Sequence, residues 1–289
     1  MYYKKKIIIL LNLLIIIFSI ILVISGNNND KYFEDVLTLV SAYYQIKSKH
    51  SYIEYLNWIK NLLLINKSLV FFTSKKFMPT VKKLRPTKLH YKTKFVELEM
   101  KDFYSYKRFK KEFNKSFSID LENSYHSIPL YMVWAEKNMF LKKAIKNNTF
   151  HSKCFYWIDA GYFRENTVNM KKYINNWPST KKCFEDKRLL MGQVKYFSQL
   201  EKEKIINFDI FSLKKLETDI NVAAGLFGGQ ADNILKFVDY YYKAINKYSK
   251  NNLFIGKEQN IYTFVAFSHP DIVKLVFYPK YYYFKIYLK

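Results

Sequence analysis

The sequence predicts an α/β domain with a mostly parallel central sheet and helices on both faces, preceded by one N-terminal transmembrane helix. Short apolar runs alternate with segments of helical periodicity through the first half of the chain. The chain has 289 residues, 49% of them hydrophobic, which is enough for one large domain with a sizeable core. An apolar run of transmembrane length stands close to Met1.

The apolar run extends from Ile7 to Ile24 and is broken only by Asn12 and Ser19. Its 18 residues would span about 27 Å as a helix, which suffices for a thin bilayer core. Three lysines precede it and favour a cytosolic N-terminus, with the remaining chain on the other side of the membrane. We therefore expect an anchor over residues 1–26, a linker over 27–34 and one domain over 35–289. A cleaved signal peptide is the alternative, and it would make the protein secreted.

Period and composition predict the elements of the domain in order. Buried strands are expected at 35–42, 68–73, 95–98 and 155–158, where apolar and β-branched or aromatic residues run together. Helical or amphipathic periodicity covers 51–61, 104–117, 128–145 and 231–248. This alternation is typical of a parallel sheet with crossover helices.

The most informative segment is Phe155–Arg164, in which a buried strand ends abruptly in Asp159. Open α/β sheets bind ligands at the carboxyl ends of their strands, so a carboxylate there is well placed to contact a metal or a ribose. Gly161 follows two positions later and permits close approach of a phosphate or sugar. Alternatively, Asp159 merely opens a turn.

Other segments offer weaker candidates. Gly225, Gly228 and Gly229 have the freedom that a phosphate-binding loop needs, but their spacing fits no known fingerprint, and a strand-to-helix turn is the alternative. Glu258 and Gln259 could contact a sugar or supply a base, or simply begin a solvated helix. His126 and His269 are the histidines of most interest.

The formal net charge of +24 comes almost entirely from lysine, since the chain has only four arginines. The lysines are spread along the chain, which favours attraction to anionic membrane surfaces or glycans over nucleic-acid binding. Cys154 and Cys183 could form one disulfide in an oxidising lumen, or they could be two buried thiols. Glycosylation sequons at Asn66, Asn114 and Asn147 are compatible with such a lumen.

Several blocks resemble, in order, the HtrL/YibB family of glycosyltransferase-like proteins. They cover most of the domain and lie at 38–44, 55–58, 69–73, 130–137, 155–164, 225–229 and 256–260. The resemblance implies a GT-A-like nucleotide-sugar transferase that acts in surface-glycan assembly. The expected partners are a nucleotide-sugar donor, a glycan, glycolipid or glycoprotein acceptor, and the membrane, with no nucleic acid.

Position by position, the resemblance and the chemistry of transfer assign provisional roles. The segment Ser41–Tyr44 would lie near the nucleotide, and the donor side would comprise Ser41, Ala42, Tyr43, Lys137, Asp159 and Gly161. The acceptor side would comprise Gly228, Gly229 and Gln259, with Glu258 as catalytic base. Asp159 stands where related enzymes have an Asp-x-Asp motif, and Gly161 replaces the second carboxylate, so Mg²⁺ or Mn²⁺ would rest on one carboxylate plus diphosphate and water. The competing hypothesis is a membrane-anchored, non-catalytic glycan- or partner-binding protein of the same fold.

Overall fold

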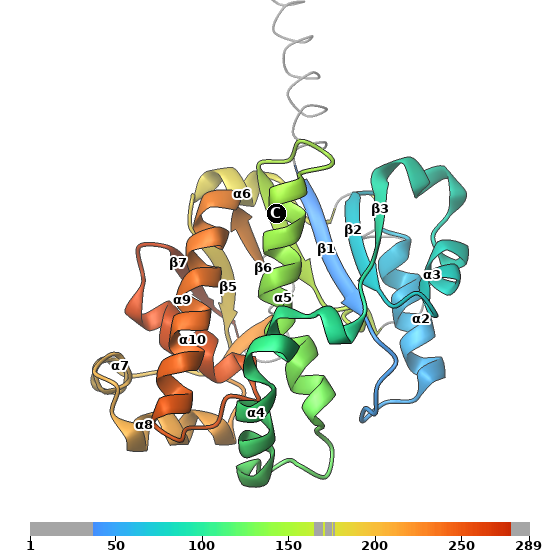
Figure 1. The fold of residues 1–289 in the computed structure, drawn as a ribbon. Helices are drawn as coiled ribbons and strands as arrows, with labels where there is room; N and C mark the ends of the chain where they lie inside the picture. The colour runs from blue at the N-terminus through green and yellow to red at the C-terminus, as the bar shows by residue number, and fades with distance from the viewer. Residues whose placement is uncertain (1–36, 165–169, 171–174, 176, 279–289) are drawn as a thin grey trace, which may run out of the picture.

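The computed structural model describes residues 37–164, 170, 175 and 177–278, which form a sheet with helices packed on both sides (Figure 1). The predicted anchor and linker lie outside the described residues. No helix within the described ranges is long and apolar enough to cross a membrane.

Seven strands make up the sheet in the described part of the chain. They are β1 (Leu37–Tyr43), β2 (Ser68–Thr73), β3 (Thr93–Glu97), β4 (Cys154–Ile158), β5 (Leu189–Gln193), β6 (Val222–Gln230) and β7 (Val273–Phe277). Their order is β3-β2-β1-β4-β6-β5-β7. Strand β6 is antiparallel to both of its neighbours, β4 and β5, and the other pairings are parallel. The mostly parallel α/β sheet predicted from the sequence is thus confirmed.

The order of the strands creates a switch point between β1 and β4. The chain adds β2 and then β3 on one side of β1, and returns to place β4 on the other side. The connections leaving β1 and β4 therefore diverge, and the carboxyl ends of these strands flank a crevice. Ligands of open α/β sheets bind at such a position.

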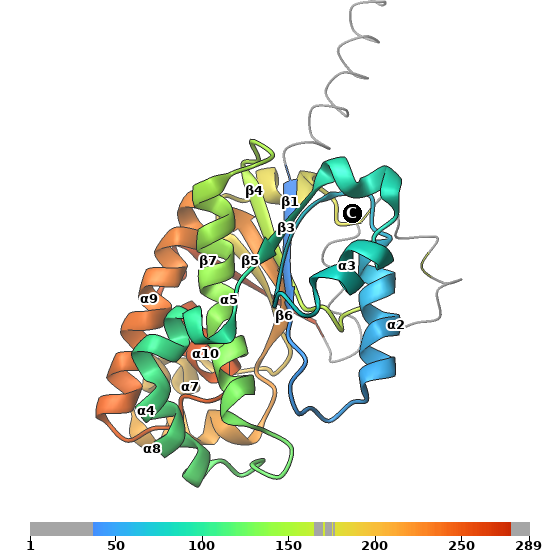
Figure 2. The ribbon, with the colours of Figure 1, turned by 45° about the vertical axis from the view of Figure 1, so that its right-hand side comes forward.

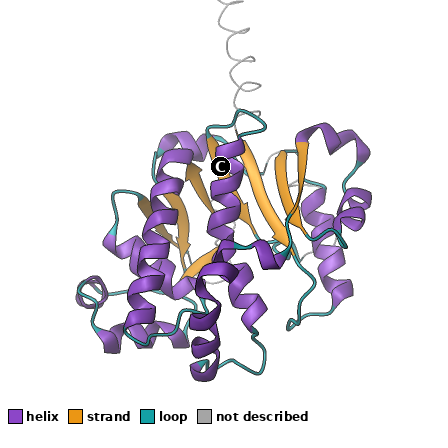
Figure 3. Ribbon diagram, in the orientation of Figure 1, coloured by secondary structure: helices purple, strands orange, loops and turns teal. Residues whose placement is uncertain are grey.

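Helices cover the two faces of the sheet unequally (Figures 2 and 3). One face packs against α4 (Tyr104–Ile119), α5 (Ile128–Asn147), α9 (Ala231–Lys250) and α10 (Glu258–Ser268). The other packs against α2 (Tyr52–Leu63) and α3 (Met78–Leu84). Shorter helices α6 (Lys181–Glu185), α7 (Gln199–Ile206) and α8 (Ile210–Lys215) complete the α-helices of the described ranges.

Alternation along the strands explains the two layers of core. In β1, Val40 and Ala42 join the larger cluster under α5, whereas Leu37 and Leu39 join the smaller one under α2. All seven residues of β1 are buried, as expected for a central parallel strand.

Local sequence signals determine where helix α5 begins and ends. Ser127 caps α5 by accepting a hydrogen bond from the Leu130 amide, and Pro129 occupies the first turn. The helix ends at Asn148, whose φ of 33° is left-handed. In the middle of α5, Glu136, Lys137 and Asn138 are consecutive buried polar residues, an unusual feature that needs partners on several sides.

The glycine-rich segment at 221–229 is an extended strand, β6, and not the turn or flexible loop that its composition favoured. Gly228 lies directly opposite Tyr156 of β4, and a Cβ atom at Gly228 would overlap the Tyr156 ring and the Phe155 carbonyl. Gly229 is equally tight, with the Arg188 carbonyl 2.8 Å from the Cβ position. These glycines are required by close packing between strands.

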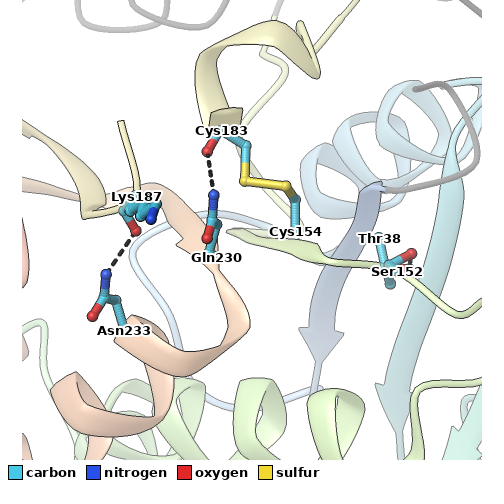
Figure 4. The surroundings of a disulfide bond; sticks show 7 residues. All are labelled: Thr38, Ser152, Cys154, Cys183, Lys187, Gln230 and Asn233. Carbon is cyan, nitrogen blue, oxygen red and sulfur yellow. Dashed lines mark hydrogen bonds between the residues drawn. A yellow bond between two sulfur atoms is a disulfide. The ribbon is translucent and has the colours of Figure 1, made fainter. Parts of the chain in front are cut away.

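The two cysteines form a disulfide that joins the start of β4 to α6 (Figure 4). Their Cα atoms are 6.3 Å apart, and 29 positions separate them in the sequence. Gln230 at the end of β6 donates a hydrogen bond to the Cys183 carbonyl at 3.3 Å, so α6 is also fastened to the neighbouring strand. Of the two alternatives left by the sequence, the structure contains the disulfide.

Candidate active site

A pocket of about 650 Å³ opens at the switch point, between the carboxyl ends of β1 and β4. Residues from the ends of both strands, from α5 and from the loops that follow the strands line it. They are Ala42, Tyr43, Tyr44, Ile46, Ser48, Tyr55, Leu130, Val133, Trp134, Lys137, Trp157, Asp159, Ala160, Gly161, Tyr162, Arg164 and Gly225. A second hollow of about 660 Å³ lies at the ends of β1, β2 and β3, and Tyr44 lines both.

Asp159 is the carboxylate of the pocket. Its backbone amide bonds to the Gly225 carbonyl at 2.8 Å, and its carbonyl accepts from the Tyr162 amide at 3.0 Å, so the residue does open a turn. Its Oδ1 accepts hydrogen bonds from Trp157 Nε1 at 2.7 Å and pairs with Lys137 Nζ at 2.9 Å. Its Oδ2 has no hydrogen-bond partner among the described residues, and the side chain is 39% exposed. One oxygen thus fixes the carboxylate and the other remains available to a ligand.

Gly225 makes room for that free oxygen. A Cβ atom at Gly225 would lie 3.2 Å from Asp159 Oδ2. Any side chain there would crowd the carboxylate, so this glycine keeps the approach to Asp159 open.

Lys137 reaches the same carboxylate from α5 and is almost completely buried. Its ammonium contacts Asp159 Oδ1, Glu258 Oε1 at 2.7 Å and the Ala224 carbonyl at 3.3 Å. An ammonium has three N–H donors, so these three acceptors satisfy it. Burial alone lowers the pKa of Lys137, but Asp159 and Glu258 outweigh that effect and hold the pKa above its usual range. Lys137 is therefore a charged cross-link between β4, β6 and α10.

Glu258 lies at the start of α10, behind Lys137, with its side chain only 5% exposed. It is not among the residues that line the pocket. The lysine and the two carboxylates carry a formal charge of −1 together, and Asp159 is the member that faces the pocket. The cluster therefore presents a net negative charge to the pocket.

The structure brings together some of the residues predicted to act on the donor. Ala42, Tyr43, Lys137, Asp159 and Gly161 all line the pocket. Ser41 does not: it is fully buried, and its hydroxyl has no partner within the described ranges. Burial, reinforced by Tyr55 and Tyr52, raises the pKa of Tyr43 to about 12, so its hydroxyl stays protonated at neutral pH.

The predicted acceptor residues are not brought to this pocket. Gly228 and Gly229 are buried inside the sheet, where packing against β4 and β5 accounts for them. Gln259 is partly buried on α10 and also lies outside the pocket lining.

The two histidines lie elsewhere. His126 Nδ1 pairs with Asp120 Oδ2 at 2.8 Å, and its ring packs edge-on against Trp134 on the outer wall of the pocket. His269 stacks on Tyr240 at 3.6 Å between ring centroids, outside the pocket lining.

Much of the aromatic pocket wall was not predicted as part of the site. Tyr55, Trp134 and Tyr162 line the pocket together with Tyr44 of the predicted donor segment, and Arg164 lies at its edge. These residues come from loops and helix surfaces, where no periodicity marks a site. Arg164 did carry a signal, because arginine is rare in this lysine-rich chain.

The described residues contain no group of three or more His, Cys, Asp or Glu side chains placed to hold a metal ion. Asp159 Oδ2 could supply one ligand from the protein. A divalent cation there would need further oxygens from a bound diphosphate and from water, which is how Mg²⁺ commonly binds in nucleotide sites.

The fold and the site together define a class: α/β proteins with a pocket at the switch point of a largely parallel sheet, the usual place for a ligand in such folds. The profile of one protein family, described as "Bacterial protein of unknown function (HtrL_YibB)", matches residues 35–288. The chain belongs to this family, as its ordered sequence blocks indicated.

Solved structures of other proteins are similar to the chain as well, and a core-mannan synthase is one of them. The core-mannan synthase A (CmsA/Ktr4) of Aspergillus fumigatus, solved in an Mn/GDP form, is similar over 83% of this chain and 72% of its own. The identity is 12% and the TM-score 0.47, a level that does not establish a shared activity. No protein with curated function matches the chain.

Proposed function

We propose that this protein is a membrane-anchored glycosyltransferase that moves a sugar from a nucleotide-sugar donor to a glycan, glycolipid or glycoprotein acceptor. The observation that carries the proposal is Asp159, which presents one free carboxylate oxygen to a pocket at the sheet's switch point. The resemblance of the chain to glycosyltransferase-like proteins with a GT-A-like fold supports the same reading.

Sugar transfer requires that the departing nucleoside diphosphate be neutralised. Asp159 Oδ2 would hold Mg²⁺ or Mn²⁺, which would supply positive charge to the diphosphate. Trp157 and Lys137 fix the other oxygen, so the free oxygen is oriented before any ligand arrives.

Lys137 and Glu258 act in this proposal by positioning Asp159. The donors of Lys137 are already occupied by protein acceptors, so a direct contact with phosphate would require one of them to be displaced. Glu258 neutralises the buried lysine from behind and is not within reach of the pocket surface. This assignment replaces the expectation that Glu258 is the catalytic base.

The aromatic wall is suited to sugar rings. Trp134 and Tyr162 on the pocket wall offer flat apolar faces beside the polar cluster around Asp159. The second hollow, at the ends of β1 to β3, provides additional volume for the larger part of a nucleotide sugar.

The test is release of free nucleoside diphosphate. Full-length protein in detergent micelles is incubated with a panel of UDP-, GDP-, CDP- and TDP-sugars, with Mg²⁺, with Mn²⁺ or with EDTA. The proposal expects release from at least one donor, and loss of that release in Asp159→Asn. No release from any donor with any metal would contradict it.

A non-catalytic glycan- or partner-binding protein is the second candidate. Its support is the single carboxylate, together with the absence of a three-group metal cluster within the described residues. Such a protein would bind glycans without releasing nucleoside diphosphate, so glycan-array binding beside the same release assay separates the two functions.

The anchor and the compartment are part of the same proposal. The apolar run at 7–24 would hold the protein in a membrane with its domain on the non-cytosolic side. The disulfide supports an oxidising compartment for that domain.

A further inference from the structure

Two cationic side chains, Lys137 and Arg164, belong to the described residues that line the pocket. The donors of Lys137 are satisfied within the protein by Asp159, Glu258 and the Ala224 carbonyl. Of these two side chains, Arg164 is therefore the one with N–H donors still available to a phosphate in the pocket.

Arg164 is held in one orientation by the turn that carries Asp159. Its Nε–H donates to the Gly161 carbonyl at 3.2 Å, two positions beyond Asp159. Its guanidinium lies 4.6 Å from the centroid of the Trp58 ring, and one terminal nitrogen is 3.5 Å from His50 Nε2. Stacking on an aromatic face and one backbone hydrogen bond restrain the plane of the guanidinium without using its second terminal nitrogen.

Trp58 forms the platform for this arrangement. The ring is 8% exposed and lies beneath both Arg164 and Gly161. A Cβ atom at Gly161 would come within 3.0 Å of the Trp58 ring and 3.2 Å of the Tyr55 ring. The indole packs so closely against the turn that only glycine fits at position 161. The same ring contacts the guanidinium of Arg164, which lines the pocket together with Asp159.

We infer that Arg164 binds the diphosphate of a nucleoside diphosphate ligand in this pocket, through a forked contact of its terminal nitrogens with two phosphate oxygens. A planar guanidinium matches the spacing of phosphate oxygens, which a lysine ammonium does not. This inference rests on the proposed function and assigns Arg164 to the donor side of the site.

The experiment measures binding by calorimetry on full-length protein in micelles, with UDP, GDP, CDP and TDP as probes and the parent nucleosides as phosphate-free controls. Titrations in EDTA isolate the contribution of the protein from that of a metal ion. We expect Arg164→Gln to weaken the binding of the diphosphate about tenfold or more and to leave nucleoside binding unchanged. Arg164→Lys should recover only part of the loss, because the charge remains and the fork is absent.

Arg108→Gln is the matched control. Its guanidinium also lies against an aromatic ring, 5.7 Å from the Phe109 centroid, but it belongs to α4 and does not line the pocket. This variant should bind each diphosphate as the wild type does. Trp58→Leu keeps the arginine in the chain but removes the ring that restrains its guanidinium, so it should also weaken diphosphate binding.

The outcomes separate the two claims. If the wild type binds none of the four diphosphates with Mg²⁺, with Mn²⁺ or with EDTA, the proposed function fails. If the wild type binds a diphosphate and Arg164→Gln binds it equally well, the inference about Arg164 is wrong and the proposed function survives. Equal losses of nucleoside and diphosphate binding in Arg164→Gln would also overturn it, since they would indicate a disturbed pocket rather than a lost phosphate contact.

Discussion

Asp159 differs from an ordinary surface carboxylate because its two oxygens have different partners. Oδ1 is fixed by Trp157 and Lys137, and Oδ2 faces the pocket without a partner among the described residues. Asp159→Asn removes the charge and keeps the shape, and Glu258 remains as a counter-ion for Lys137, so function and folding are measured together to separate the two effects.

Asp159→Asn is expected to lower nucleoside diphosphate release by about 100-fold or more, because the charge that holds a metal–diphosphate ion pair is lost. Release is measured at saturating donor, and thermal unfolding is measured on the same preparation. Asp239→Asn removes an exposed carboxylate that pairs with Lys142, and it should change neither quantity. A near wild-type rate in Asp159→Asn would refute the assignment.

Lys137 contributes to stability through the buried cluster. Lys137→Met leaves Glu258 buried without its cation, which should cost about 3–5 kcal/mol of unfolding free energy. Lys142→Met breaks an exposed pair on the same helix and should cost about 1 kcal/mol or less. Chemical denaturation of both variants beside the wild type measures the difference, and equal costs would contradict the role given to Lys137.

The same cluster predicts a pH dependence. The pKa of Lys137 is raised above its ordinary value of 10.5, so its stabilising contribution is fully present below that value. The contribution is lost only as the pH rises through the higher pKa of the folded state. The stability difference between wild type and Lys137→Met should therefore stay constant between about pH 7 and about pH 9 and shrink above the ordinary lysine pKa. A difference that falls steeply between about pH 7 and about pH 9 would show that the lysine is not held charged.

Strand β6 contributes glycines both to the packing of the sheet and to the pocket. Its glycines occupy different environments: Gly228 faces the Tyr156 ring inside the sheet, and Gly225 faces Asp159 at the pocket. The two positions allow a paired test of one strand.

Gly228→Ala should prevent stable folding, because the new methyl group would overlap both the Tyr156 ring and backbone of β4. Gly225→Ala should fold, because its methyl group meets Asp159 Oδ2 at 3.2 Å and the neighbour can shift slightly, but it should impair donor use. Yield, thermal unfolding and diphosphate release are compared for both variants. A folded Gly228→Ala that has lost only acceptor use would restore Gly228 to the acceptor site.

The disulfide stabilises the start of β4, the strand that delivers Asp159. For a sequence separation of 29, loop-closure entropy predicts a contribution of roughly 3–4 kcal/mol. Denaturation with and without a reducing agent measures it, and the double variant Cys154→Ala/Cys183→Ala should be insensitive to the reducing agent. If the reducing agent has no effect on the wild type, the bond does not carry this stability.

Elements with strong periodicity could be predicted from the sequence, and elements shaped by their neighbours could not. The strand at 68–73 and the helix beginning at Ile128 are confirmed, since uniform apolar burial and a Ser-Ile-Pro start are local signals. Strand β6 was predicted as a turn or loop because its small residues are required by packing against the side chains of β4, which lie some 70 positions earlier in the sequence. Strands β5 and β7, at the far side of the sheet, were not predicted.

At the scale of the whole molecule, the site is an outcome of topology. Lys137, Asp159 and Glu258 are distant in sequence and meet because α5, β4 and α10 converge at one end of the sheet. The sequence suggested all three as site residues. It could not show that Lys137 forms ion pairs with both carboxylates, because this pairing depends on the distances between α5, β4 and α10.

The proposed anchor predicts the orientation of the whole molecule. In sealed membrane vesicles with the non-cytosolic side enclosed, the domain should resist added protease until detergent is present. Degradation without detergent would show that the orientation is wrong. A mature protein that begins near Gly26 would show that the apolar run is a signal peptide.

We propose that a nucleotide ligand binds at the switch point between β1 and β4. Hydrogen exchange of the full-length protein, with and without the nucleoside diphosphate that binds most tightly, tests it most directly. We expect slower exchange at 43–46 and at 159–164, the two segments that leave these strands and line the pocket. Slower exchange confined to other parts of the domain, under conditions where calorimetry shows saturation, would contradict it.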